Sequence, residues 1–118
     1  MPTINFKATN TEVDDSLKTL AEQKLQALEK FVQDTPAILD VEFEKVTAQQ
    51  SGNIYRVEAN MQLDGWLFRA QSTMDSFEKA IDEVRDQLDK ELRRNAKKQE
   101  TLFKKGARKI KEMLRFGK

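Results

Sequence analysis

The sequence predicts an α+β fold: a two-layer sandwich of order β-α-β-β-β-α, in which a four-stranded sheet carries two helices on one face and a basic C-terminal tail follows. Three observations predict it. Four short segments alternate apolar and polar residues, as half-buried strands do, and two longer segments repeat apolar residues at helical spacing. The length of 118 residues fits one domain with a single core and is too short for two.

The first strand and the first helix are predicted before Pro36. Residues 4–8 alternate apolar with polar side chains, which gives the strand one apolar face. Asn10 and Thr11 are candidate N-caps for the helix that follows, because short polar side chains accept hydrogen bonds from the free amides of a first turn. This helix is expected to run for about 20 residues. Its apolar stripe comprises Val13, Leu17, Leu20, Ala21, Leu28, Phe31 and Val32.

The next three strands are predicted to form a meander. Residues 38–44 and 55–63 alternate apolar with polar side chains, and the second run is the clearest strand pattern in the chain. Asp64-Gly65 suits a two-residue type I′ hairpin turn. Residues 66–71 make the fourth strand, in which Leu67 competes for the inward side with the phase of Trp66, Phe68 and Ala70.

A second long helix is predicted after the fourth strand, with caps between Ser72 and Asp75. Its apolar stripe comprises Phe77, Ile81, Val84, Leu88 and Leu92. The pattern then becomes polar and finally basic and amphipathic, and Gly106 lowers the helix propensity of that last segment by about 1 kcal/mol. We therefore divide the chain into a domain of residues 1–98 and an extension of residues 99–118, which we expect to be mobile until it meets a partner.

Charge is distributed unevenly along the chain. The formal net charge is +1, yet residues 1–92 hold 10 Lys/Arg against 18 Asp/Glu, whereas residues 93–118 hold 11 Lys/Arg against two acids. A chain with one strongly basic end is typical of proteins that bind a polyanion. The basic end therefore predicts a nucleic acid or an anionic surface as its partner.

The composition excludes most enzyme chemistry. The chain has no Cys and no His, which removes disulfides, thiolate and imidazole metal sites and His-based catalysis. Carboxylate clusters such as Asp14 with Asp15, or Asp82 to Asp86, lie on predicted outward helix faces without a nucleophile nearby. The acids in residues 40–44 are more typical of the wet side of a sheet than of a cation site. We therefore predict no enzyme, no catalytic residue, no metal, no cofactor and no small-molecule substrate.

No segment has the run of about 20 apolar residues that a membrane helix needs. The N-terminus opens directly into a strand pattern instead of a basic leader and an apolar run. A cytoplasmic protein without a membrane partner is therefore expected.

The strongest functional signal is a stripe of cations on the second helix. Helical spacing places Lys90, Arg93 and Lys97 on one face, with Arg94 and Lys98 beside them, directed away from the apolar stripe. Two or three such residues would suit a helix C-terminus, but 11 cations among 26 residues exceed that. The stripe predicts binding to phosphates, which is steeply dependent on salt.

The order of elements favours folded RNA as the nucleic acid. A single-strand reader of the RRM type needs aromatic side chains on the open sheet face, whereas Phe43, Tyr55 and Phe68 share the core-facing side. The α-β-β-β-α portion has the order of a double-stranded-RNA-binding domain with one strand added in front. The alternative is a protein- or membrane-interaction module that uses the basic amphipathic tail, through Phe103, Ile110 and Leu114.

Four sequence segments, in their order and spacing, connect the chain to a known family. They are Ile4-Asn5-Phe6, Lys24-Leu25-Gln26-Ala27-Leu28-Glu29-Lys30-Phe31, Phe43-Glu44-Lys45-Val46, and Ala80-Ile81-Asp82 followed by a basic run. With the β-α-β-β-β-α layout, they resemble the short form of the ribosome hibernation-promoting factor and ribosome-associated inhibitor family, over residues 1–98.

The resemblance implies a non-enzymatic protein that binds the small ribosomal subunit in the channel for messenger and transfer RNA. There it would block translation under stress or in stationary phase, with ribosomal RNA as its partner and a second hibernation factor as a further candidate partner. Carried over by position, the implied RNA contacts are Lys24, Lys30, Lys45, Lys90, Arg93, Arg94, Lys97 and Lys98. The basic tail adds Lys104, Lys105, Arg108, Lys109 and Lys111 as further candidate contacts.

Overall fold

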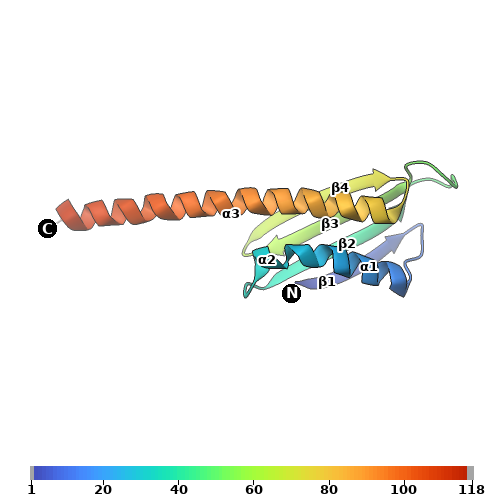
Figure 1. Ribbon diagram of the computed structural model, residues 1–118, viewed down its shortest axis with the longest axis horizontal. Helices are drawn as coiled ribbons and strands as arrows, with labels where there is room; N and C mark the ends of the chain where they lie inside the picture. Colours follow the sequence, from blue (N-terminus) through green and yellow to red (C-terminus); the bar gives the residue numbers. More distant parts are fainter. Residues whose placement is uncertain (1, 117–118) are drawn as a thin grey trace.

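The computed structural model describes the chain over residues 2–116, and its side chains over residues 2–102. It confirms the predicted α+β sandwich. A four-stranded sheet lies in one layer, and both helical segments cover the same face of it (Figure 1). The last helix extends far beyond the sheet (Figure 1).

The sheet is mixed, in the order β1-β2-β3-β4. The strands are β1 (Thr3–Thr9), β2 (Ala37–Lys45), β3 (Tyr55–Leu63) and β4 (Trp66–Met74). β1 pairs with β2 in parallel, and the other two pairs are antiparallel, which is the predicted meander. Because parallel neighbours need a crossover connection, the first helical segment passes over the sheet between β1 and β2.

The hairpin between β3 and β4 has the predicted turn. Asp64 and Gly65 both have positive φ, +51° and +80°, as a type I′ turn requires. β4 runs to Met74, three residues beyond the prediction. Its inward phase is that of Phe68 and Ala70, since Ala70 is buried and Leu67 is 52% exposed.

The first helical segment starts later than predicted. Helix α1 (Asp15–Leu25) has Asp14 as its N-cap, whose Oδ1 accepts a hydrogen bond from the backbone N–H of Leu17 at 2.8 Å. The assignment of Asn10 or Thr11 as the cap was wrong, because residues 10–13 connect the end of β1 to the start of α1 and are not helical. A 3₁₀ turn, η1 (Gln26–Leu28), and a short α2 (Glu29–Val32) follow α1.

The second helix, α3 (Phe77–Phe116), is continuous over 40 residues. Its cap is Ser76, whose Oγ accepts from the backbone N–H of Lys79 at 3.2 Å, and not a residue between Ser72 and Asp75. Ser72 was a wrong candidate because β4 extends through it and buries it. At 1.5 Å per residue the helix is about 60 Å long, which accounts for most of the molecule's 72 Å length.

The helix continues without a break across the predicted domain boundary at residues 98 and 99. The proposed division of the chain therefore stays a prediction. The expected mobility of the tail, and the side chains of its basic residues, lie outside what the structure describes.

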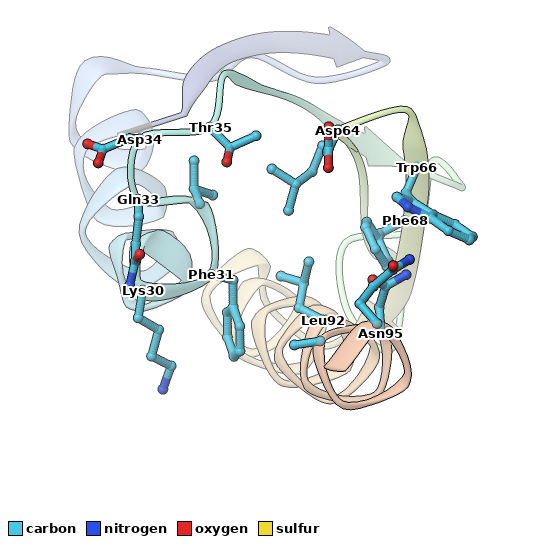
Figure 2. A pocket seen from close by; sticks show the side chains of 14 residues that line it. Lys30, Phe31, Gln33, Asp34, Thr35, Asp64, Trp66, Phe68, Leu92 and Asn95 are labelled. Atoms are coloured by element: carbon cyan, nitrogen blue, oxygen red, sulfur yellow. The ribbon is translucent and has the colours of Figure 1, made fainter. Parts of the chain in front are cut away.

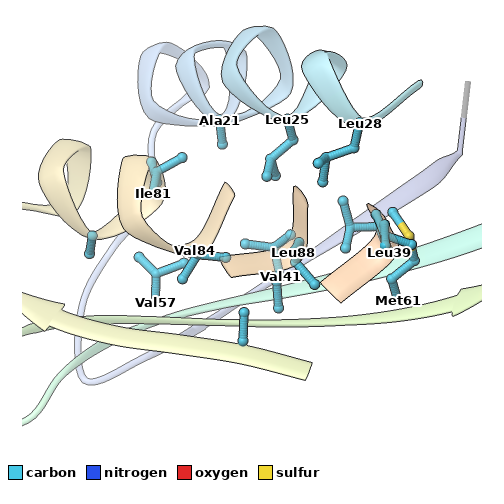
Figure 3. Packing of buried hydrophobic residues seen from close by; sticks show 14 of the residues in the cluster. Ala21, Leu25, Leu28, Leu39, Val41, Val57, Met61, Ile81, Val84 and Leu88 are labelled. Atoms are coloured by element: carbon cyan, nitrogen blue, oxygen red, sulfur yellow. The ribbon is translucent and has the colours of Figure 1, made fainter. Parts of the chain in front are cut away.

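The core lies between the helices and the sheet (Figure 3). Leu25 and Leu28 from the first helical segment meet Val84 and Leu88 of α3 above strand residues such as Val41 (Figure 3). Full burial of a side chain of this size contributes about 1.5 to 3 kcal/mol, so these contacts fix how both helices sit on the sheet. The predicted stripe of α3 is the buried one: Ile81, Val84, Leu88 and Leu92 are at most 2% exposed.

Candidate nucleic-acid interface

The cation stripe of α3 faces solvent, as predicted. Lys90, Arg93, Arg94, Lys97 and Lys98 are all exposed, and the apolar stripe of the same helix is buried beneath them. Burial of that apolar stripe fixes the rotation of the helix, so the five cations point away from the sheet layer. We call these five residues the basic stripe.

Three members of the basic stripe keep their charge uncompensated within the described residues. Arg93 is hydrogen-bonded to Asp89, and Arg94 pairs with Glu91 at 3.2 Å. Lys90, Lys97 and Lys98 make no ion pair with any side chain described in residues 2–102. These lysines can therefore approach a phosphate without first breaking an internal pair.

Asp89 links the basic stripe to α2. Its carboxylate accepts from Arg93 and lies 3.6 Å from the Nζ of Lys30. The Arg93 hydrogen bond, with help from Lys30, holds the pKa of Asp89 below its ordinary value although partial burial opposes this. Both cations also lie over the ring of Phe31, at 5.3 Å and 5.4 Å from its centroid. Lys30 and Arg93 thus form one cluster, which brings two predicted RNA contacts together.

Lys24 is placed differently from the basic stripe. Its side chain is only 19% exposed, and its Nζ lies 2.6 Å from Asp82 and 3.8 Å from Glu78 of α3. The amine therefore ties α1 to α3. This geometry favours a structural role for Lys24 over direct contact with a phosphate.

Lys45 also lies apart from the basic stripe. It ends β2 opposite Tyr55, whose ring packs against Phe77 at the start of α3. Lys97 is 20 residues further along the same helix, which is about 30 Å. The structure does not bring Lys45 and the basic stripe together. The candidate contacts in the tail, from Lys104 to Lys111, have side chains outside the described residues.

Sequence reasoning missed Arg69. This residue is exposed on the edge strand β4 and lines a shallow groove of about 350 Å³ together with Lys90 and Glu91. Within residues 2–102 it makes no ion pair, so it extends the basic surface from α3 onto the sheet edge. Its alternation with the inward-facing Phe68 and Ala70 indicates that the Arg69 side chain points away from the core. The sequence pattern does not indicate that α3 lies beside this strand position.

Three carboxylates of the open sheet face pair with one arginine. On the open sheet face, Arg56 lies 2.6 Å from Glu58, 3.3 Å from Glu44 and 3.4 Å from Glu42. The hydrogen bond to Glu58 raises the pKa of Arg56, and desolvation opposes this. Arg56 thus takes the place that a metal ion would need, and no metal-binding group of three or more His, Cys, Asp or Glu occurs in the described residues.

The acidic clusters on the helices have structural roles. Asp14 caps α1, and Arg85 pairs with Asp82 at 3.4 Å and with Asp86 at 3.1 Å.

A larger hollow lies where α3 leaves the sheet. Its volume is about 480 Å³, and it opens between the end of α2, the β3–β4 hairpin and α3 (Figure 2). Phe31 lies on one side, Phe68 and Asn95 on the other, and Trp66 at the rim (Figure 2). We call this hollow the exit groove.

A family model described as Sigma 54 modulation protein / S30EA ribosomal protein matches residues 4–100, which include the sheet, both helical segments and the basic stripe. The chain belongs to this family. The S30AE family comprises ribosome-associated modulation factors and is not a family of enzymes. The family assignment made from the four sequence segments is therefore confirmed.

Two solved structures support the S30AE fold. The chain is similar to the N-terminal domain of Protein Y from Thermus thermophilus, with 26% identity and a TM-score of 0.68, over 80% of this chain and 98% of that one. It has the same fold as a ribosomal subunit interface protein from Coxiella burnetii, with 21% identity and a TM-score of 0.68, over 81% of this chain and 98% of that one.

No curated protein sequence matches the chain at a significant level. In the part of the chain that the structure describes, no helix has the length and apolar composition needed to cross a bilayer.

Proposed function

We propose that this protein is a ribosome dormancy factor. In this proposal it acts in the cytoplasm, binds the RNA of the small ribosomal subunit in the channel for messenger and transfer RNA, and blocks translation under stress or in stationary phase. Membership of a ribosome-associated family supports the ribosome as partner. The observation that carries the proposal is the basic stripe, whose five cations are exposed on the face of α3 opposite the core.

The mechanism needs only binding. Each phosphate neutralised by a cation releases condensed counterions, and this gives tight association that weakens steeply as salt rises. Backbone phosphates carry no base identity, which suits the recognition of folded RNA by its shape. A packed body that fills the channel excludes messenger and transfer RNA sterically, so no covalent step is required.

The proposed contacts differ in whether an internal ion pair must break before the side chain can bind a phosphate. Lys90, Lys97 and Lys98 bind phosphates directly, and Arg69 assists from the sheet edge beside Lys90. Arg93, Arg94 and Lys30 bind by exchanging an internal carboxylate for a phosphate.

The remaining candidate contacts take secondary places in the proposal. Lys24 acts mainly by holding α1 on α3, and Lys45 makes a separate contact at the other end of the sheet. Residues 1–98 form the binding domain, and the cations of residues 99–118 add charge to it.

The subunit and the channel can be tested together by sedimentation. The protein is expected to travel with isolated small subunits and not with large ones, because the proposed site exists only on the small subunit. Preloading the small subunits with messenger RNA and initiator transfer RNA is expected to displace it. Equal binding to both subunits, or binding that ignores preloading, would contradict the proposed site.

A further inference from the structure

The exit groove combines features that the basic stripe lacks. Its floor is apolar, formed by side chains such as Val32, Leu63 and Leu92, of which Val32 and Leu92 are 2% exposed. Its rim is open to solvent and carries polar side chains together with Trp66. A hollow of about 480 Å³ is large enough for one small ring system and too open to enclose a whole ligand.

Aromatic side chains surround the exit groove. Phe31 and Phe68 are half-buried in its walls, and Trp66 is 46% exposed at the rim, where its ring is directed outward beyond β4 (Figure 2). Exposed aromatic faces are the usual platforms for unstacked nucleobases, and one stacking contact is worth about 1 to 3 kcal/mol.

Charged groups of both signs stand around the exit groove, and its lining includes Lys30, Asp34 and Asp64. Lys30 and Arg93 lie at the Phe31 side, and Arg93 belongs to the basic stripe, so the stripe adjoins the groove at this side. The amides of Asn95 and Gln99 line the α3 side and can pair with base edges. Asp64 lies across the groove from α3 (Figure 2), where a carboxylate can accept from an exocyclic amine but would repel a phosphate.

We propose that the exit groove binds one unpaired nucleotide, with its base against Phe68 and its phosphates toward Lys30 and Arg93. This proposal rests on the proposed function and deepens it, because it assigns an unpaired base to a protein whose other contacts read only the backbone. Apolar peptides fit the floor but not the cations at the Phe31 side. The continuity of the groove with the basic stripe therefore favours RNA as the occupant.

Trp66 provides the test, because it is the only tryptophan in the chain and stands at the rim. A short single-stranded RNA is expected to quench its fluorescence in a saturable way. A blunt duplex of equal length is expected to bind the basic stripe without that quenching.

The groove can be filled without changing any charge. Ala96→Phe places a ring on an exposed position of α3 that lines the groove, and about tenfold weaker binding of the single strand is expected. Ala48→Phe is the matched control, since it makes the same change on an exposed alanine in the β2–β3 loop at the other end of the sheet. Duplex binding is expected to be unchanged in both variants.

The outcomes separate this inference from the proposed function. Unchanged single-strand binding by Ala96→Phe, or single-strand binding without quenching of Trp66, overturns the nucleotide site and leaves the basic stripe intact. An apolar peptide that quenches Trp66 and competes with the single strand overturns the choice of RNA as occupant. Failure of the unaltered protein to bind either RNA overturns both proposals.

Discussion

Arg93 makes two interactions within the protein before any RNA arrives. It donates a hydrogen bond to Asp89, it lies over Phe31, and Asp89 also attracts Lys30. An arginine that moves from a carboxylate to a phosphate keeps a charge-assisted hydrogen bond, so the exchange has a small net cost. The carboxylate left behind then reports the exchange, because its pKa depends on Arg93.

Replacing Arg93 by glutamine is expected to raise the pKa of Asp89 toward its ordinary value of 3.8. The lowered pKa stabilises the fold fully at neutral pH, and this contribution is lost as the pH falls through the lowered pKa in the acid range. The variant is therefore less stable than the unaltered chain near neutral pH, and its free energy of unfolding falls less when the pH is lowered through the acid range. Carboxyl chemical shifts of Asp89 during an acid titration measure the change.

Arg94→Gln is the matched control for that titration, because Arg94 pairs with Glu91 and not with Asp89. It is expected to leave the pKa of Asp89 where it is. If Arg93→Gln also left it unchanged, the Arg93 hydrogen bond would not be the cause of the lowered value.

Single residues differed in how far the sequence predicted them. The exposure of Lys90, Arg93 and Lys97 followed from helical spacing alone, because burial of one face sets the direction of the other. The internal pairing of Lys24 with Asp82 could not be foreseen, since the two residues are 58 positions apart and meet only when α1 packs on α3. Ion pairs between residues that are far apart in the sequence therefore cannot be predicted from spacing along one helix.

At the scale of elements, α1 and α3 are joined by both packing and charge. Leu25 and Leu28 belong to the same buried core cluster as Leu88 of α3. Beside this cluster, Lys24 of α1 forms an ion pair with Asp82 of α3. Partly exposed ion pairs of this kind contribute about 0.2 to 1 kcal/mol.

Lys24→Met keeps the apolar stem of the side chain and removes the amine. The free energy of unfolding, measured in urea, is expected to fall by about 0.5 to 1 kcal/mol. Binding to small subunits is expected to stay close to that of the unaltered chain, because the amine already pairs with Asp82 of α3. Lys18→Met on the same helix is the control, since Lys18 has no ion pair within residues 2–102. A loss of ribosome binding with unchanged stability would instead make Lys24 an RNA contact.

Strands were easier to predict than helix ends. Alternation marks a half-buried strand directly, so all four strands were located from pattern, although β4 proved longer. The caps were misplaced at both helices because several polar residues precede each one. The choice of Asp14 and Ser76 depends on where the chain clears the sheet, and that is set by tertiary packing.

At the scale of the whole molecule, α3 changes its charge along its length. Within the body it presents acids such as Glu78 and Asp82, which face the lysine of α1, and from Arg93 onward its described side chains are mostly cationic or polar. This division follows the uneven charge of the sequence, which was readable without a structure. The exit groove was not readable, because Phe31, Trp66 and Asn95 come from three separate elements and converge only in the fold.

In the proposed function, the basic stripe holds ribosomal RNA by its phosphates. The test is the affinity for small subunits as a function of salt, for the unaltered chain and for Lys90→Glu with Lys97→Glu. A control with the same change in net charge is Lys7→Glu with Lys79→Glu, on the open sheet face and at the start of α3.

The unaltered chain and the control are expected to show the same steep loss of affinity with salt. Reversal of Lys90 and Lys97 is expected to weaken binding and to make the slope of log affinity against log salt shallower by about 1.5, because two phosphate contacts disappear. If the Lys90 and Lys97 variant kept both the affinity and the slope of the unaltered chain, the basic stripe would not be the surface that binds the ribosome.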